Sequence, residues 1–147
     1  GHWSAGRYFT TFNDYHFNVD GDGEIIYTRP LDEVPRATWH RNTGSIAIAL
    51  CCCYNARPDD LGEYPPTEAQ IETLAKMFAV IADVFDNPID REHFMTHGEA
   101  ANDDGYGLYS GEPDCRWDLE QLCDQDEIGT GGDILRGKAQ WYLENGV

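Results

Sequence analysis

The stretch GSIAIALCCCY, residues 44–54, is a continuous apolar run bounded by a glycine on one side and a polar loop on the other. An unbroken run of this length, without polar residues in alternation, is typical of a strand that is buried on both faces of a sheet. We therefore predict a central strand here. Cys51, Cys52 and Cys53 are expected to be small, buried apolar residues at its end.

The segments on either side of this run supply packing partners for the strand. Upstream, YHFNV and EIIYT (residues 15–19 and 24–28) flank the turn sequence DGDG, which predicts two strands joined by a tight turn. Downstream, residues 67–85 carry apolar side chains at helical spacing. This segment begins with Thr67 and Gln70 in the pattern of a capping box, so we expect a helix that packs on the sheet.

The second half of the chain is less regular. Residues 87–118 carry few signals of secondary structure and are rich in Asp, Gly, Pro and Tyr, which is typical of a functional loop. WDLEQLC, residues 117–123, suggests a short helix, and residues 131–146 suggest a C-terminal helix with Asp133 near its start and Gly146 past its end. We expect one mixed α/β domain over residues 1–147, with a single central sheet flanked by helices.

Composition excludes several classes of partner. The net charge is −17, with 27 acidic residues against 10 Lys and Arg, so we expect no nucleic acid as partner. No apolar run approaches the ~20 residues that span a bilayer, so we expect no membrane insertion. The sequence shows no secretory signal. Five cysteines without a CxxC pair argue against a disulfide framework and against a cysteine zinc site.

Five histidines are the first candidates for chemistry: His2, His16, His40, His93 and His97. A catalytic zinc commonly takes three protein ligands and keeps one position for water, and these ligands need not be close in sequence. Spacing alone therefore does not identify a site. By position alone, a histidine as close to the start of the sequence as His2 is expected to be solvated and idle.

Six short segments together resemble one family, and they occur in its order. These are HWSAG at 2–6, DYHFNVDGDGEII at 14–26, TWHRNTGSIAIAL at 38–50, PTEAQIETLAKMFAVI at 66–81, THGEA at 96–100 and RWD at 116–118. They resemble the zinc-dependent N-acetylmuramoyl-L-alanine amidases of the type 2 family. That family includes phage lysozyme-amidases and is related to peptidoglycan recognition proteins. The resemblance runs from His2 to about residue 119.

The resemblance implies one Zn²⁺ per chain, held by His2, His97 and Asp118. The third ligand of the family varies among Asp, His and Cys, which leaves Cys115 as the alternative to Asp118. In the family a strand runs up to the first histidine ligand, whereas only Gly1 precedes His2 here. We expect either that the chain is trimmed or processed, or that this strand is absent and the first ligand is poorly held.

The resemblance also implies roles around the metal. Tyr15 matches a tyrosine that lies beside the metal in phage members, and Arg116 stands where those members have a lysine. Arginine does not donate its proton at ordinary pH, so Arg116 is expected to stabilise an oxyanion together with Tyr15. His16 alternates with Tyr15 and is expected to face away from the metal. Trp39 and His40 are expected to line the substrate cleft. Glu99 is also expected to contact substrate, and its alternatives are to support the second ligand or to be a solvated acid.

The implied function is hydrolysis of the amide bond between N-acetylmuramic acid and L-alanine in peptidoglycan. Asp118, His40 and Glu99 are the open choices for the group that accepts a proton from water. We expect a phage or prophage endolysin, made in the cytoplasm and acting on the bacterial wall. The alternatives are an interbacterial toxin on the same fold and a peptidoglycan-binding module without the metal. The sequence leaves the oligomeric state open.

Overall fold

The computed structural model describes residues 1–147 and contains one sheet of four short strands. The strands are β1 (His2–Trp3), β2 (Phe17–Val19), β3 (Ile25–Tyr27) and β4 (Ile48–Leu50). Their order is β1-β4-β2-β3, with β4 parallel to both of its neighbours and β2 antiparallel to β3. This confirms the expected mixed sheet, the hairpin and the central position of the apolar run.

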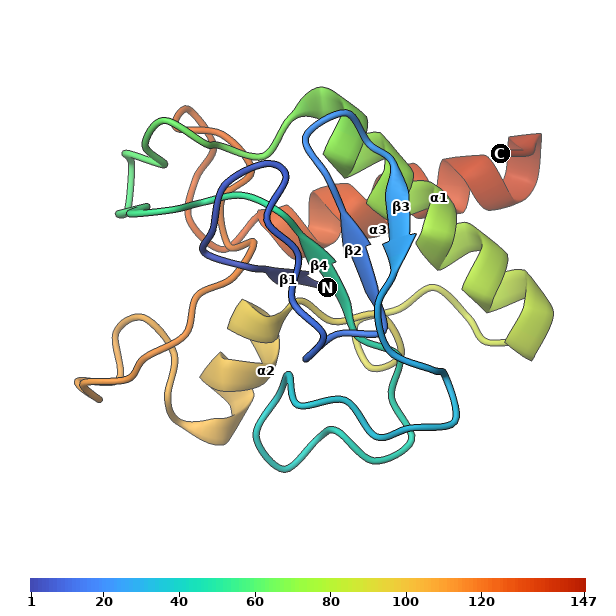
Figure 1. Ribbon diagram of the computed structural model, residues 1–147, viewed down its shortest axis with the longest axis horizontal. Helices are drawn as coiled ribbons and strands as arrows, with labels where there is room; N and C mark the ends of the chain where they lie inside the picture. Colours follow the sequence, from blue (N-terminus) through green and yellow to red (C-terminus); the bar gives the residue numbers. More distant parts are fainter.

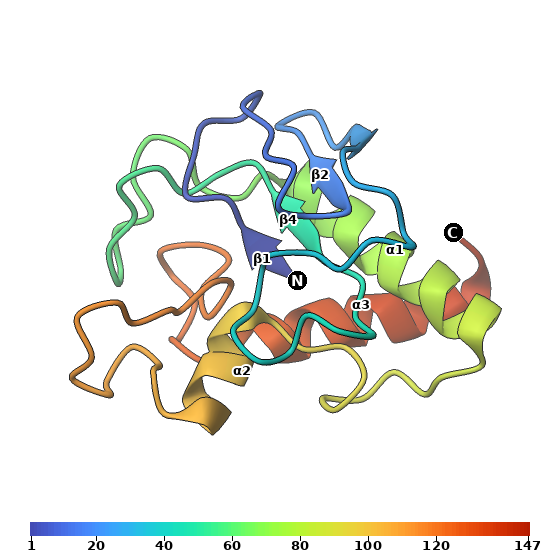
Figure 2. The ribbon, with the colours of Figure 1, turned by 60° about the horizontal axis from the view of Figure 1, so that its bottom comes forward.

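Three helices accompany the sheet: α1 (Glu68–Phe85), α2 (His97–Asp104) and α3 (Gly131–Asn145). In Figures 1 and 2, α1 and α3 lie side by side, while α2 stands apart near the start of β1. The core is formed by apolar side chains of β4 and of these two packed helices: Ile48, Leu50, Leu74, Phe78, Leu135 and Ala139. None of the helices is both long and apolar enough to cross a membrane.

Helix α1 is fixed to the sheet through its first turn. Thr67 and Gln70 form the expected capping box. The buried Gln70 amide also donates hydrogen bonds to the carbonyl oxygens of Val19 (3.1 Å) and Cys51 (2.9 Å). These two carbonyls lie at the ends of β2 and β4, so one side chain ties the helix start to two strands. The same end of the sheet holds the buried cysteines, and all five cysteines of the chain are free.

Two expectations for the second half of the chain are wrong. Residues 97–104 form α2 inside the segment predicted to be irregular, and its capping box of Thr96 and Glu99 is a signal that the sequence does contain. Residues 117–123 form turns instead of a helix. Leu119 has a φ of 63°, in the left-handed region, which a right-handed helix does not tolerate. The C-terminal helix is confirmed, with Gly146 at its C-cap.

Candidate metal centre

Three side chains from distant parts of the chain meet at the amino end of α2. They are His2 on β1, His97 in the first turn of α2, and Asp118 in the turn before α3. One potential ligand atom from each lies within 4.8 Å of the other two. All three side chains are buried. This is the histidine–histidine–carboxylate set that the resemblance implied, and such a set could bind one metal ion.

Backbone hydrogen bonds hold the three ligand segments against one another. The His97 amide donates to the Gly1 carbonyl at 2.8 Å, and the Gly98 amide donates to the Asp118 carbonyl at 3.1 Å. The Trp3 amide donates to Asp118 Oδ2 at 3.2 Å. Each pair of segments is therefore tied directly, so the positions of the three side chains are set by the fold.

The close approach of two of these segments requires a glycine. A Cβ atom on Gly98 would lie 2.6 Å from Glu120 Cγ and 2.9 Å from the Asp118 carbonyl oxygen. Real Cβ atoms do not approach that closely, so Gly98 is what allows α2 to begin against the Asp118 turn. The left-handed backbone at Leu119 lies in the same turn. The expected helix over 117–123 is thus replaced by a turn that delivers Asp118.

The donor atoms fit a tetrahedral metal. His2 Nδ1 is a buried nitrogen without a hydrogen-bond partner, and it lies 3.8 Å from Asp118 Oδ2. His97 Nδ1 lies 3.5 Å from the same oxygen. Two ligands that each bind zinc at about 2.0–2.1 Å are about 3.3 Å apart in a tetrahedron. Buried nitrogens normally have a hydrogen-bond partner. His2 Nδ1 has none and lies near the ideal ligand spacing from Asp118 Oδ2, as expected for a metal ligand.

Sequence reasoning missed the two hydroxyl groups that contact the outer nitrogens of the histidines. Thr38 Oγ1 lies 3.3 Å from His2 Nε2, and Tyr106 Oη lies 3.2 Å from His97 Nε2. With Nε2 donating to a hydroxyl oxygen, each ring leaves Nδ1 free to bind a metal. Thr38 adjoins the Trp-His segment, but nothing in the sequence around Tyr106 indicates this contact.

Removal of these hydroxyl groups is expected to weaken zinc binding. Tyr106→Phe and Thr38→Val should each raise the zinc dissociation constant about 10- to 100-fold, because the outer hydrogen bond that orients the ring is lost. Competition with a chelating dye measures this directly. Tyr109→Phe is the matched control, since Tyr109 is 83% exposed on the same loop. Zinc binding as tight in Tyr106→Phe as in the control would contradict the orienting role.

The protonation states at the cluster also suit a cation. Burial lowers the pKa of His2 to about 4, so the ring is neutral at physiological pH. Burial disfavours the charged form of Asp118, but the adjacent imidazole rings of His2 and His97 outweigh this and hold its pKa well below the ordinary range. A neutral imidazole and an ionised carboxylate are the forms that bind metals.

Tyr15 and Arg116 both lie on the cavity beside the cluster, which measures about 640 Å³ and is also lined by His97 and Asp118. The Tyr15 ring centroid is 5.2 Å from that of His2. Burial, together with the nearby charge of Asp118, raises the pKa of Tyr15, so its hydroxyl keeps its proton and is able to donate a hydrogen bond. His16 is fully buried and accepts a hydrogen bond from the Ala47 amide at Nδ1, consistent with a structural role.

Trp39 and His40 lie on the loop between β3 and β4, which passes beside α2 in Figure 2. Their rings stack at 3.8 Å, and both side chains are exposed. The ring centroids of Trp39 and Tyr106 lie 5.9 Å apart with the rings nearly perpendicular. Trp39 and His40 therefore adjoin the histidine cluster through Tyr106, which contacts His97. Their contact with substrate stays a prediction.

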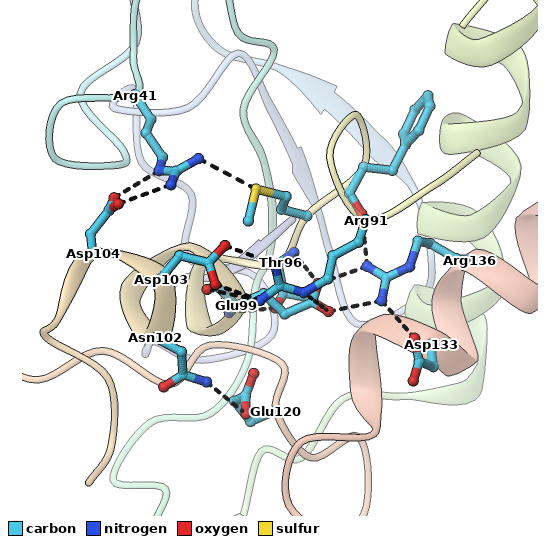
Figure 3. Close-up of polar contacts among 12 residues, drawn as sticks. Arg41, Arg91, Thr96, Glu99, Asn102, Asp103, Asp104, Glu120, Asp133 and Arg136 are labelled. Atoms are coloured by element: carbon cyan, nitrogen blue, oxygen red, sulfur yellow. Dashed lines mark hydrogen bonds and ion pairs between the residues drawn. The ribbon is translucent and has the colours of Figure 1, made fainter. Parts of the chain in front are cut away.

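Glu99 lies away from the cluster's cavity, among the polar contacts in Figure 3. It is buried, with its two oxygens 2.7 and 2.8 Å from the Arg136 guanidinium. Oε1 also accepts from the Thr96 amide. Glu99 is therefore not a solvated acid. Its contacts join α2, which carries His97, to α3, and its expected contact with substrate stays a prediction.

Cys115, the alternative third ligand, is half-buried on the wall of the same cavity. Its sulfur is not among the atoms that meet at the cluster, whereas Asp118 Oδ2 is. The geometry therefore favours the carboxylate. His93 pairs with Asp90 at 2.7 Å, away from the three ligands.

Comparison with known proteins adds an independent observation. A family model described as N-acetylmuramoyl-L-alanine amidase matches residues 2–108, which is well over half of the chain. Searches of the curated proteins and of the solved structures gave no match. The matched residues include His2, Tyr15 and His97. Asp118 and Arg116 lie beyond them, so their placement rests on the geometry and on the RWD segment. The chain belongs to the N-acetylmuramoyl-L-alanine amidase family.

Proposed function

We propose that this protein is a zinc-dependent amidase that cleaves the bond between N-acetylmuramic acid and the L-alanine of the peptidoglycan stem peptide. The observation that carries the proposal is the meeting of His2, His97 and Asp118 in a chain of the amidase family. The family implies peptidoglycan as the substrate. The ligand set supports an enzyme over a module that only binds the wall.

An unactivated amide needs both an electrophile and a nucleophile to be supplied. The chemistry that zinc provides when bound is Lewis-acid polarisation of a carbonyl and activation of water near neutral pH. His2, His97 and Asp118 would hold it. Tyr15 would donate a hydrogen bond from its protonated hydroxyl to the oxyanion that develops on the scissile carbonyl. Arg116 would add a fixed positive charge on the same side.

The role of Tyr15 predicts a loss of turnover without a loss of metal. Tyr15→Phe should reduce kcat about 100- to 1000-fold, the usual cost of removing one oxyanion donor, while zinc per chain stays at the parent level. Steady-state hydrolysis of a muramyl peptide and elemental analysis give the two numbers. Tyr109→Phe serves again as the control. Normal turnover in Tyr15→Phe would show that this assignment is wrong.

The proposed function itself is tested by zinc content and product identity together. We expect about one zinc per chain in the parent and little in His2→Ala, with release of L-alanyl peptides from peptidoglycan by the parent alone. Mass spectrometry of the products identifies the bond that is cleaved. No zinc in either protein after reconstitution, together with retained binding to peptidoglycan, would instead support the binding module.

We also propose, from the resemblance to phage members, that the enzyme acts as an endolysin. It should reduce the turbidity of bacterial cells whose outer layers have been permeabilised, and the His2→Ala variant should not. Lysis that occurs only on secretion into a neighbouring cell, and that is blocked by a dedicated inhibitor protein, would indicate the toxin alternative.

A further inference from the structure

Two cavities adjoin the residues of the candidate metal centre. The first, of about 680 Å³, lies between the loop before β4, the second half of α1 and residues 87–97. The second is the 640 Å³ cavity that holds Tyr15 and Arg116. His2 lines the first, Asp118 lines the second, and His97 lines both. Each cavity is therefore lined by two of the three ligands, and His97 is common to both.

The two cavities differ in charge. The second contains Arg36 and Arg116, and its only carboxylate is that of Asp118. The first contains three acids (Asp32, Glu33 and Glu92) and one arginine, Arg41. Arg41 is already paired with both oxygens of Asp104, at 2.7 and 2.9 Å (Figure 3). In a chain with a net charge of −17, a cationic cavity beside the candidate site is unusual.

The charge of Arg116 in the second cavity is not used within the protein. Its guanidinium donates to the backbone carbonyls of Asp114 (2.9 Å) and Cys115 (3.2 Å) and has no carboxylate partner within 4.0 Å. Arg41, Arg91 and Arg136 each have such a partner. Carbonyl contacts hold a guanidinium in place without neutralising it, so Arg116 keeps the cavity positive.

Arg36 is the second cation of this cavity and lies close to Tyr15. Its backbone amide donates to the carbonyl of Asp14, the residue before Tyr15, at 2.9 Å. Its guanidinium lies 3.3 Å from the Asp14 carboxylate, and both side chains are largely exposed. An exposed pair of this kind contributes about 0–1 kcal/mol, so Arg36 can exchange Asp14 for a carboxylate of a ligand at little cost.

The sugar half and the peptide half of the proposed substrate also differ in charge. The sugar side presents hydroxyl and acetamido groups, whereas the peptide carries a glutamate after L-alanine, whose α-carboxylate is either free or amidated. We propose that the second cavity takes the peptide half, and that Arg36 selects a free carboxylate on the residue after L-alanine. This inference rests on the proposed amidase function. It leaves the first cavity, whose arginine is already paired with Asp104, to the uncharged sugar side.

The test compares two substrates that differ only in that carboxylate. We expect the parent to hydrolyse muramyl-L-alanyl-D-glutamate with a kcat/KM about 2- to 5-fold above that of the amidated form, the range of an exposed ion pair. Arg36→Gln should remove most of this preference by raising KM for the free acid, with kcat unchanged. Lys76→Gln on α1 makes the same change in net charge outside this cavity and should keep the preference.

Equal hydrolysis of the two substrates by the parent, or an unchanged preference in Arg36→Gln, would overturn the inference. Failure to hydrolyse either substrate would count against the proposed function instead. In that event, calorimetry of the binding of L-alanyl-D-glutamate and L-alanyl-D-isoglutamine still tests whether Arg36 selects the free carboxylate. Tighter binding of the acid, lost in Arg36→Gln, supports the selective cavity, and equal binding contradicts it.

Discussion

Asp118→Ala is expected to purify with little zinc and to hydrolyse muramyl peptides about a thousandfold more slowly than the parent. The reason is that Asp118 Oδ2 is the one atom close to both histidine nitrogens, at 3.8 and 3.5 Å. Lewis-acid catalysis is worth several kcal/mol, and about 4 kcal/mol corresponds to three orders of magnitude in rate. Elemental analysis and a product assay on the same preparation measure both effects.

Cys115→Ser is the informative companion to this variant. Cys115 lies three residues before Asp118 on the wall of the same cavity, and it was the alternative third ligand that the sequence left open. We expect Cys115→Ser to keep about one zinc per chain and near-parent activity. The reverse pattern, with zinc lost in Cys115→Ser and retained in Asp118→Ala, would show that the loop rearranges around the metal and that Cys115 is the ligand.

Arg136→Met should lower the free energy of unfolding by about 3 kcal/mol, which corresponds to a melting temperature lower by about 10 °C. The substitution leaves Glu99 buried without its bidentate partner. Breaking a buried ion pair by removing one member costs about 3–5 kcal/mol. The low end applies because Arg91 Nε still lies 3.5 Å from Glu99 Oε2. Chemical denaturation measures the difference in the free energy of unfolding, provided that the two proteins have the same dependence on denaturant concentration.

Asp133→Asn is the matched control, since it removes the other carboxylate on the same guanidinium. Asp133 lies 2.8 Å from Arg136, but its side chain is 85% exposed, so we expect a change within about 1 kcal/mol. An equal loss of stability in both variants would show that burial of the Glu99–Arg136 pair does not explain the destabilisation by Arg136→Met.

The destabilisation in Arg136→Met should also depend on pH. Burial opposes ionisation of Glu99, but the hydrogen bonds from Arg136 outweigh it and hold the pKa of this carboxyl below its ordinary value. A pKa that is lower in the folded state gives stability that is present above the unfolded value and lost as the pH falls. The difference in the free energy of unfolding between the parent and Arg136→Met should therefore become smaller below about pH 4.

Local sequence patterns predicted the elements whose apolar spacing and end signals lie within the same short segment. The apolar run at 44–54, the DGDG hairpin and the capped helix at 67–85 each carry their signal within a few residues, and all three are present. Helix α2 was missed although its capping box is visible, because its eight residues include few apolar side chains at helical spacing.

The helix expected at 117–123 is absent for a tertiary reason. The WDLEQLC pattern is compatible with a helix by itself, but Leu119 adopts a left-handed backbone and the Asp118 carbonyl accepts from Gly98. Local propensity is a weak preference, and a turn that brings a carboxylate to two histidines is stabilised by contacts with α2 that the sequence does not reveal.

The sequence by itself determined the fold class, the family and the three candidate ligands, because these depend on periodicity and on short segments in a fixed order. The tertiary structure alone showed that the Nδ1 atoms face Asp118, that Thr38 and Tyr106 contact the outer nitrogens, and that Glu99 pairs with Arg136. The longest of these contacts, between His2 and Asp118, joins residues 116 positions apart. Packing of the sheet against the helices brings such distant residues into contact. No local sequence pattern indicates which hydroxyl or carboxylate groups will meet in this way.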